Sequence, residues 1–364
     1  MTFARSSSSR LARRLARSGR ALRCVVGATA ALCFVACTDS RHDEATLARG
    51  QVQYASKCAL CHGPRGEGYI ADQANALANP EFLSAASDAF LEHAIVRGRP
   101  GTTMSPWGTA FGGPLTDDDA RAIVRVLRSW QTVASNAPES RVGGEALRGA
   151  SLYAVECASC HGREGRGGPF LSVTNPEFLA SASDGYLFDG ITLGRSGTPM
   201  PAFAPRLSEL QRLDLVAYLR SLAVDPLAPP AVLPTFDPAR VVQNPAGPDP
   251  AFIDDPPRFL PGERLKAAYD SAARVVVLDA RPPADYVAGH IQGAQSMPFY
   301  AVDIRVDLLP RDVWIVTYCG CPHAESGALA DQLSTRGFSN VRVLDEGFGH
   351  WRAQGWPTRG GAEP

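Results

Sequence analysis

The sequence has almost no net charge, few methionines and no long apolar run. Its 364 residues carry a formal net charge of −1, so no excess of basic residues indicates a nucleic-acid partner. The apolar run of residues 24–36 is shorter than the about 20 residues that a membrane-spanning helix requires. Methionine occurs only at Met1, Met104, Met200 and Met297. A chain of this length allows two to three domains.

Residues 1–37 have the pattern of an export signal. Seven arginines between Arg5 and Arg23 precede the apolar run that begins at Cys24. The run ends in Phe34-Val35-Ala36-Cys37, which resembles the processing site of bacterial lipoproteins, and that resemblance implies lipidation of Cys37. Cleavage nearby without a lipid and an uncleaved anchor are the alternatives. All three place the rest of the chain in the periplasm or outer cell envelope.

One pattern occurs twice, as Cys58-Ala-Leu-Cys61-His62 and as Cys157-Ala-Ser-Cys160-His161. C-x-x-C-H is the attachment signature of c-type haem, in which two thiols form thioethers to one porphyrin and the histidine ligates the iron. The alternatives for a C-x-x-C pair are a structural zinc site and a redox-active dithiol, and both need surrounding sequence that is missing here. The sequence therefore predicts two covalently bound haem c groups.

The repeat extends well beyond these pentapeptides. Each copy has a glycine and a tyrosine at fixed spacing before its first cysteine, and Asn-Pro-Glu-Phe-Leu after its histidine, at residues 79–83 and 175–179. Ser-Asp, Gly-Arg and Gly-Thr-x-Met then follow in the same order in both copies. Such self-similarity indicates one unit, duplicated, over residues 45–133 and 145–222.

Each unit is expected to be helical. Residues 45–56 predict a helix that enters the first attachment site, and Gly50 on it would permit close approach of another helix. Residues 116–130 predict a closing helix with Thr116 as N-cap. The closing helix of the second unit is expected to begin at Ser208, with an apolar face made of Leu210, Leu213, Val216, Ala217 and Leu219.

Both units resemble class I cytochrome c domains, which are all-α. In that family a methionine on a loop is the distal iron ligand, which would be Met104 opposite His62 and Met200 opposite His161. His93 is a rival distal ligand in the first unit, although it has no counterpart in the second. With both axial positions filled by protein, outer-sphere electron transfer is expected rather than oxygen or peroxide chemistry.

A Pro-rich linker over residues 223–260 precedes a different kind of domain. The linker has no hydrophobic period and predicts either a tether or a strap on the surface. Apolar runs at 275–278, 314–318 and 341–344 predict parallel strands buried on both faces. A helix is expected over 326–336, ending at Gly337. This order indicates an α/β domain over residues 261–358, a parallel sheet with flanking helices.

This segment resembles a rhodanese-like domain. The resemblance rests on residues 278–281 (Leu-Asp-Ala-Arg), on residues 285–294 and on residues 343–348 with Trp351. In that family the cysteine after the central strand is a nucleophile that accepts a sulfane sulfur as a persulfide, which here would be Cys319. Its place between a strand end and a helix N-terminus favours the thiolate. A buried apolar cysteine is the alternative.

The loop from Cys319 to Ser326 departs from that family. It is one residue longer, and Glu325 stands where arginine is common, so we expect repulsion of thiosulfate and a raised thiol pKa. Pro322 removes a backbone donor, and Cys321 adds a second thiol. Three interpretations remain open: a sulfurtransferase with another donor, a redox-active Cys319/Cys321 pair, and a catalytically silent binding module.

Taken together, the sequence predicts a dihaem cytochrome c that transfers electrons in the bacterial cell envelope. Its rhodanese-like domain would handle sulfane sulfur or thiol redox at Cys319. The alternative is an electron carrier whose rhodanese-like domain only docks partners. The expected partners are redox proteins, a sulfur-containing small molecule and the membrane through a lipid anchor, with no nucleic acid.

Overall fold

The computed structural model describes residues 43–69, 74–135, 143–254, 258–320 and 323–364. The predicted export signal with Cys37, and the second thiol Cys321, lie outside these residues. Within the described ranges, no helix is long and apolar enough to cross a membrane.

The first helical unit begins with a helix over residues 43–53 that widens into a π-helical turn, η1 (Tyr54–Cys58), and continues as α2 (Ala59–His62). It is followed by α3 (Pro80–Ala85), α4 (Asp88–Arg97) and α5 (Asp117–Ser129). Thr116 caps α5 as predicted, in a capping box with Asp119.

The second helical unit repeats this order with α6 (Ala146–Glu156), α7 (Ala158–His161), α8 (Pro176–Ser181), α9 (Asp184–Leu193) and α10 (Glu209–Ser221). Ser208 caps α10 as predicted. The predicted apolar face was wrong at Leu210, which is 55% exposed, whereas Leu215 is buried. Leu210 and the buried Leu219 are nine positions apart, which places them on opposite sides of a helix.

A glycine lies at the main helix crossing of each unit. A Cβ built at Gly50 would lie far inside van der Waals contact distance of the Ala122 carbonyl oxygen on α5, and one at Gly149 would lie equally close to the Asp214 carbonyl oxygen on α10. The backbones therefore approach as closely as the absence of a side chain allows, as predicted for Gly50.

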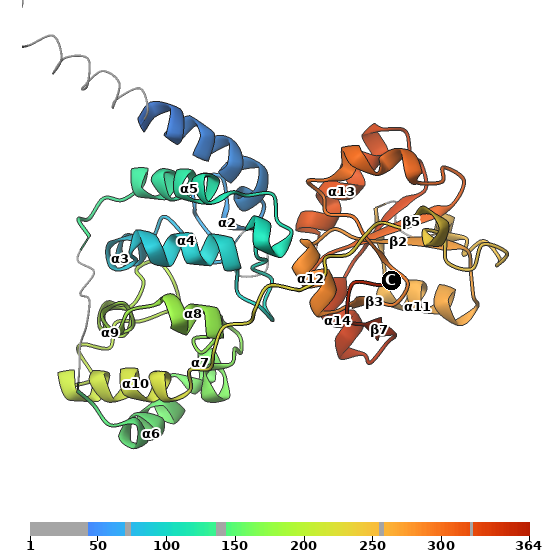
Figure 1. Ribbon diagram of the computed structural model, residues 1–364. Helices are drawn as coiled ribbons and strands as arrows, with labels where there is room; N and C mark the ends of the chain where they lie inside the picture. Colours follow the sequence, from blue (N-terminus) through green and yellow to red (C-terminus); the bar gives the residue numbers. More distant parts are fainter. Residues whose placement is uncertain (1–42, 70–73, 136–142, 255–257, 321–322) are drawn as a thin grey trace, which may run out of the picture. The chain divides into compact units, whose positions relative to one another are not determined.

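The C-terminal unit is an α/β domain with a five-stranded parallel sheet of order β1-β6-β5-β2-β4, which confirms the predicted fold class. Figure 1 draws it in orange to red, after the blue-to-yellow helical units. The strands are β1 (Phe259–Leu260), β2 (Val275–Asp279), β4 (Gln295–Ser296), β5 (Trp314–Tyr318) and β6 (Val341–Leu344), and an antiparallel pair joins β3 (His290–Ile291) to β7 (Thr358–Arg359). The helices are α11 (Gly262–Asp270), α12 (Pro283–Ala288), α13 (Ala324–Thr335) and α14 (Gly347–Ala353).

Single 3₁₀ turns occur along the described chain, at η2 (Thr109–Phe111), η3 (Arg163–Gly165), η4 (Pro238–Arg240), η5 (Phe252–Asp254), η6 (Val302–Ile304) and η7 (Val306–Leu308).

Helices cover both faces of this sheet, so its central strands β2 and β5 are mostly apolar. Val275 and Val277 of β2 share a core cluster with Leu265 of α11 and Trp351 of α14. Their neighbours on β2 belong to the other cluster, which includes Leu329 of α13. Because side chains alternate along a strand, a continuous β-branched run is what a doubly covered sheet requires.

The Pro-rich segment lies on the α/β domain as a strap. Gln243 exchanges backbone hydrogen bonds with Val275 at 2.8 and 3.3 Å, and Arg274 donates from its backbone N–H to the carbonyl oxygen of Pro248. Phe252 is buried in the core beside Trp314. These contacts favour the strap over the tether.

Candidate functional site

A cavity of about 1000 Å³ is lined by both copies of the repeated signature. The structure brings together the predicted thiols, histidines and methionines of the two copies, which are Cys58, Cys61, His62, Met104, Cys157, Cys160, His161 and Met200. Aromatic and aliphatic side chains complete the lining, among them Phe82, Phe90, Phe178 and Tyr186. A large, mostly apolar cavity with a few convergent ligand groups is what a porphyrin requires.

The two histidines are oriented in the same way. His62, at the end of α2, has its Nδ1 at 2.9 Å from the carbonyl oxygen of Asn75, and His161 has its Nδ1 at 3.0 Å from that of Leu171. A carbonyl oxygen only accepts, so Nδ1 carries the proton and Nε2 is left to bind a metal. Burial lowers the pKa of His62, which keeps its ring neutral. These features fit a proximal iron ligand.

The leading cysteine of each signature is held as a neutral thiol. Burial raises the pKa of Cys58 to about 12, and burial together with Glu156 raises that of Cys157 to about 12. Both thiols line the cavity together with Cys61 and Cys160.

Equivalent loops hold Met104 and Met200. In the first copy the Arg99 backbone N–H donates to the Met104 carbonyl oxygen at 2.7 Å, and the Met104 N–H donates to Thr102 Oγ1 at 3.1 Å. The second copy makes the same two bonds with Arg195, Met200 and Thr198 at 3.0 and 3.2 Å. The repeated Gly-Arg and Gly-Thr-x-Met motifs thus form the same hydrogen-bonded loop in both copies.

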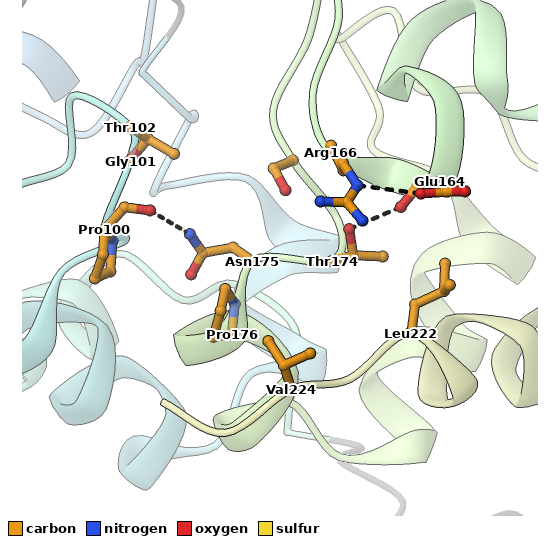
Figure 2. A pocket seen from close by; sticks show the side chains of 11 residues that line it. Pro100, Gly101, Thr102, Glu164, Arg166, Thr174, Asn175, Pro176, Leu222 and Val224 are labelled. Carbon is orange, nitrogen blue, oxygen red and sulfur yellow. Dashed lines mark hydrogen bonds and ion pairs between the residues drawn. The ribbon is translucent and has the colours of Figure 1, made fainter. Parts of the chain in front are cut away.

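The two helical units contact each other through reciprocal hydrogen bonds. Asn79 Nδ2 donates to the Ser196 carbonyl oxygen at 2.9 Å, and Asn175 Nδ2 donates to that of Pro100 at 2.9 Å. Figure 2 shows the second bond beside a smaller pocket of about 300 Å³. Pro100 and Ser196 each come directly after a Gly-Arg motif, so each helical unit bonds the other through equivalent residues.

The glutamates of the two Asn-Pro-Glu-Phe-Leu motifs differ in their partners. Glu81 accepts from the backbone N–H of Ser196 at 3.2 Å and from its hydroxyl at 2.8 Å. Pro100 has no N–H to offer, so Glu177 cannot make the equivalent bond.

Glu177 is instead bound by two side chains of α4. It accepts from Arg97 at 2.7 and 2.9 Å and from His93 Nε2 at 2.7 Å. Burial opposes its ionisation, but the bonds from Arg97 and His93 lower the pKa of Glu177. His93, the rival distal ligand, is therefore engaged with Glu177. Sequence reasoning missed this network, since no local pattern joins residues 84 positions apart.

Cys319 lies at the end of β5 and is fully buried. Its Sγ is 3.2 Å from Ser326 Oγ. The helix that follows, α13, has His323 as its N-cap residue, with φ of +71° and no side-chain capping bond. The ring of His323 bonds Asp345 Oδ1 at 2.7 Å and stacks on Phe259. The Cys319 thiol therefore has the hydroxyl of Ser326 as a partner.

Two neighbours of Cys319 line the large cavity, namely Gly320 and Glu325. Burial, followed by the nearby Cys319 sulfur, raises the pKa of Glu325 well above its usual range. A raised pKa favours the neutral carboxyl and so weakens the charge on which the expected repulsion of thiosulfate depended. Arg281 is paired with Asp279 at 2.6 Å, and both side chains are buried.

Comparison with known proteins divides the chain as the structure does. The family model described as "Cytochrome C oxidase, cbb3-type, subunit III" matches residues 45–125 and 144–219, and that of the "Rhodanese-like domain" matches residues 262–354. The chain is 32% identical over 181 residues to the cbb3-type cytochrome c oxidase subunit FixP of Azorhizobium caulinodans, covering 48% of this chain and 59% of that protein. It is 30% identical to subunit CcoP of Azospirillum sp. (strain B510), covering 48% and 62%. The chain thus spans about three fifths of the length of these relatives.

Two solved structures are similar to parts of this chain. The reducing HAO-like protein complex of Kuenenia stuttgartiensis has 26% identity with 48% of this chain, over 96% of its own chain, at a TM-score of 0.35. The rhodanese-like domain of an Anabaena protein has 31% identity with 29% of this chain, over 80% of its own, at a TM-score of 0.27. The chain therefore contains two cytochrome c domains, matched at residues 45–125 and 144–219, followed by a rhodanese-like domain, matched at residues 262–354.

Proposed function

We propose that the protein is an electron carrier that holds two covalently bound haem c groups. Cys58 and Cys61 would form the thioethers of the first group, with His62 and Met104 as axial ligands. Cys157 and Cys160, with His161 and Met200, would do the same for the second. The observation that carries the proposal is the bond from each histidine Nδ1 to a backbone carbonyl, which leaves Nε2 as the ligand atom in both copies.

The bound groups supply one-electron chemistry, and the protein supplies orientation and a dry environment. Met104 and Met200 would hold the positions that oxygen or peroxide would need, so the chemistry supplied there would be electron transfer without a substrate on the iron. Both ligand sets line one cavity, which supports relay from one group to the other.

The proposed location is the periplasm or outer cell envelope, through the export signal of residues 1–37 and a lipid on Cys37. Redox proteins of the envelope are the proposed partners. The relatives named as cbb3-type oxidase subunits support this, as does the "Alcohol dehydrogenase (quinone), cytochrome c subunit" of Gluconacetobacter polyoxogenes, 26% identical over 230 residues.

The rhodanese-like domain has two candidate roles. Thiol or sulfane-sulfur chemistry at Cys319 is supported by the contact of its sulfur with Ser326 and by Gly320 and Glu325 in the lining of the cavity. A docking role without chemistry is the alternative, supported by the complete burial of Cys319.

The test is a redox titration of the holoprotein with single methionine variants. Met104→Ala and Met200→Ala should each lower the potential of one of two haem waves and halve the methionine-to-iron charge-transfer band. Met297→Leu, at a fully buried methionine of the α/β domain, is the matched control and should change neither wave. A single haem per chain, or two unshifted waves in both variants, would contradict the proposal.

A further inference from the structure

Gly320, which follows Cys319, lies against the loop that carries Met104. A Cβ built at Gly320 would be 3.8 Å from Thr103 Cγ2, and Thr103 immediately precedes Met104. Next along the chain, Ser105 lies near Asp285, at the start of α12, and acts to lower the pKa of that carboxyl. The rhodanese-like site and the distal side of the first haem site are therefore direct neighbours.

Aromatic contacts hold this junction in place. Trp107 packs edge-to-face on Phe299, with ring centroids 6.1 Å apart, and lies 6.0 Å from the ring of Tyr300. Tyr300 Oη donates to the carbonyl oxygen of Gly112 at 3.3 Å. These side chains belong to one core cluster that also contains Cys319. Such packing keeps two redox sites at a constant separation.

The surroundings of Cys319 select a small, uncharged reactant. The thiol has no exposed surface, and its sulfur already contacts Ser326 Oγ. The nearest guanidinium, that of Arg281, is paired with Asp279 and offers no free charge to an anion. Glu325 and Asp285, which border the site, both have raised pKa values because they are buried. Because the Arg281 guanidinium is already paired, an anion such as thiosulfate would gain less from it than the hydration that the anion loses on entering this site.

We propose that this site oxidises hydrogen sulfide, with the cytochrome domains as electron acceptor. One S–H bond breaks on the Cys319 thiol and one on the sulfide, and a sulfur–sulfur bond forms between them. The products are a Cys319 persulfide, two protons released to water, and two electrons that leave in single steps for two ferric haems. The step rests on the proposed function, which supplies both acceptors.

Fusion to an electron acceptor changes which sulfur compound can load the rhodanese-like site. A rhodanese-like site is ordinarily loaded by a donor that already contains sulfane sulfur, and no electrons are exchanged. Here the Thr103–Gly320 contact provides an electron outlet, so sulfide itself can load the thiol. Persulfide formation then depends on the oxidation state of the haems.

The test adds sodium sulfide, without oxygen, to fully oxidised holoprotein and to holoprotein that ascorbate has already reduced. We expect two haems to be reduced for each Cys319 that gains one sulfur atom, measured by absorption and by mass spectrometry of the Cys319 peptide. Pre-reduced protein should gain no sulfur. Equal sulfur gain in both states would overturn the electron balance, and so the proposal.

Variants separate the thiol from the junction. Cys319→Ser should lose both sulfur gain and rapid haem reduction by sulfide, while ascorbate still reduces its haems. The leucine side chain of Gly320→Leu extends beyond a Cβ that would already touch Arg281 and Thr103, so it should displace the junction. A displacement of about 1 Å can slow a positioned reaction by about 100-fold, and haem reduction by sulfide should slow accordingly. Ser339→Leu, at an exposed position of the same domain, is the size-matched control.

The outcomes also distinguish this inference from the proposed function. If sulfide reduces Cys319→Ser as fast as the wild type, the sulfide inference is wrong, although the electron carrier stands. If ascorbate-reduced protein cannot pass electrons to ferricyanide, the proposed function fails as well. Haem reduction by sulfide in the wild type without any sulfur on Cys319 also overturns the inference.

Discussion

Removing the buried carboxylate of Glu177 should weaken the contact between the two cytochrome domains. Glu177 has no exposed surface and accepts three charge-assisted or polar hydrogen bonds from Arg97 and His93. In Glu177→Ala these donors lose their acceptor while remaining about three quarters buried, with side-chain exposures of 24% and 26%. The variant therefore combines a lost interaction with unsatisfied donors at His93 Nε2 and Arg97 Nε, whereas Arg97 Nη2 keeps its bond to the Leu227 carbonyl oxygen.

The expected cost follows from these burials. Breaking a fully buried ion pair costs about 3–5 kcal/mol, and the partial exposure of both donors allows water to recover part of it, which leaves about 3 kcal/mol. With an m-value of about 2 kcal/mol per molar urea, the unfolding midpoint should fall by about 1.5 M. Glu177→Gln keeps the shape and one acceptor oxygen, so its loss should be smaller.

Urea unfolding followed by haem absorption measures this effect, because that signal reports on the cytochrome domains alone. The matched control is Glu81→Ala in the other copy, whose partially exposed carboxylate meets only Ser196 and should cost about 1 kcal/mol or less. Equal losses in Glu81→Ala and Glu177→Ala would refute the reasoning, since the two glutamates would then contribute equally despite their different partners.

Two further changes test the helix crossing and the buried acid. Gly50→Ala should lower the free energy of unfolding by about 1–3 kcal/mol, because its Cβ has no room against the Ala122 carbonyl; a gain from helix propensity in urea unfolding would contradict this. Glu325 has a folded-state pKa above its unfolded value of about 4.3, so it stabilises the fold most at low pH and loses that contribution as the pH rises. Glu325→Gln should therefore gain stability relative to the wild type from pH 5 to pH 8 in thermal unfolding, and a difference independent of pH would count against the buried neutral acid.

Local and repeated signals in the sequence predicted most of the fold. The strand over residues 314–318 matches β5, and Gly337 follows the last residues of α13 in a left-handed conformation, because β-branched runs and helix ends are determined by neighbouring residues. The doubled spacing of the cysteines, histidines and methionines predicted which side chains now line one cavity.

The same reasoning could not predict contacts between residues far apart in the sequence. The Arg97–Glu177 pair, the Thr103–Gly320 contact and the burial of Phe252 beside Trp314 join residues far apart in the chain. The charge expected of Glu325 also depended on burial, which a single sequence does not give. Leu210 was misplaced because an apolar residue at an exposed helix position looks like any other leucine in the pattern.

The reciprocal bonds from Asn79 and Asn175 bear on how the two halves can evolve. Both asparagines bind a backbone carbonyl, which is present whatever the side chain, so proline and serine can occupy equivalent positions without breaking the contact. Two identical chains related by a two-fold axis would have to change both halves at once. Within one chain each half mutates alone, and the different partners of Glu81 and Glu177 are the result of that freedom. The duplication thus preserves one geometry while allowing the two redox centres to specialise separately.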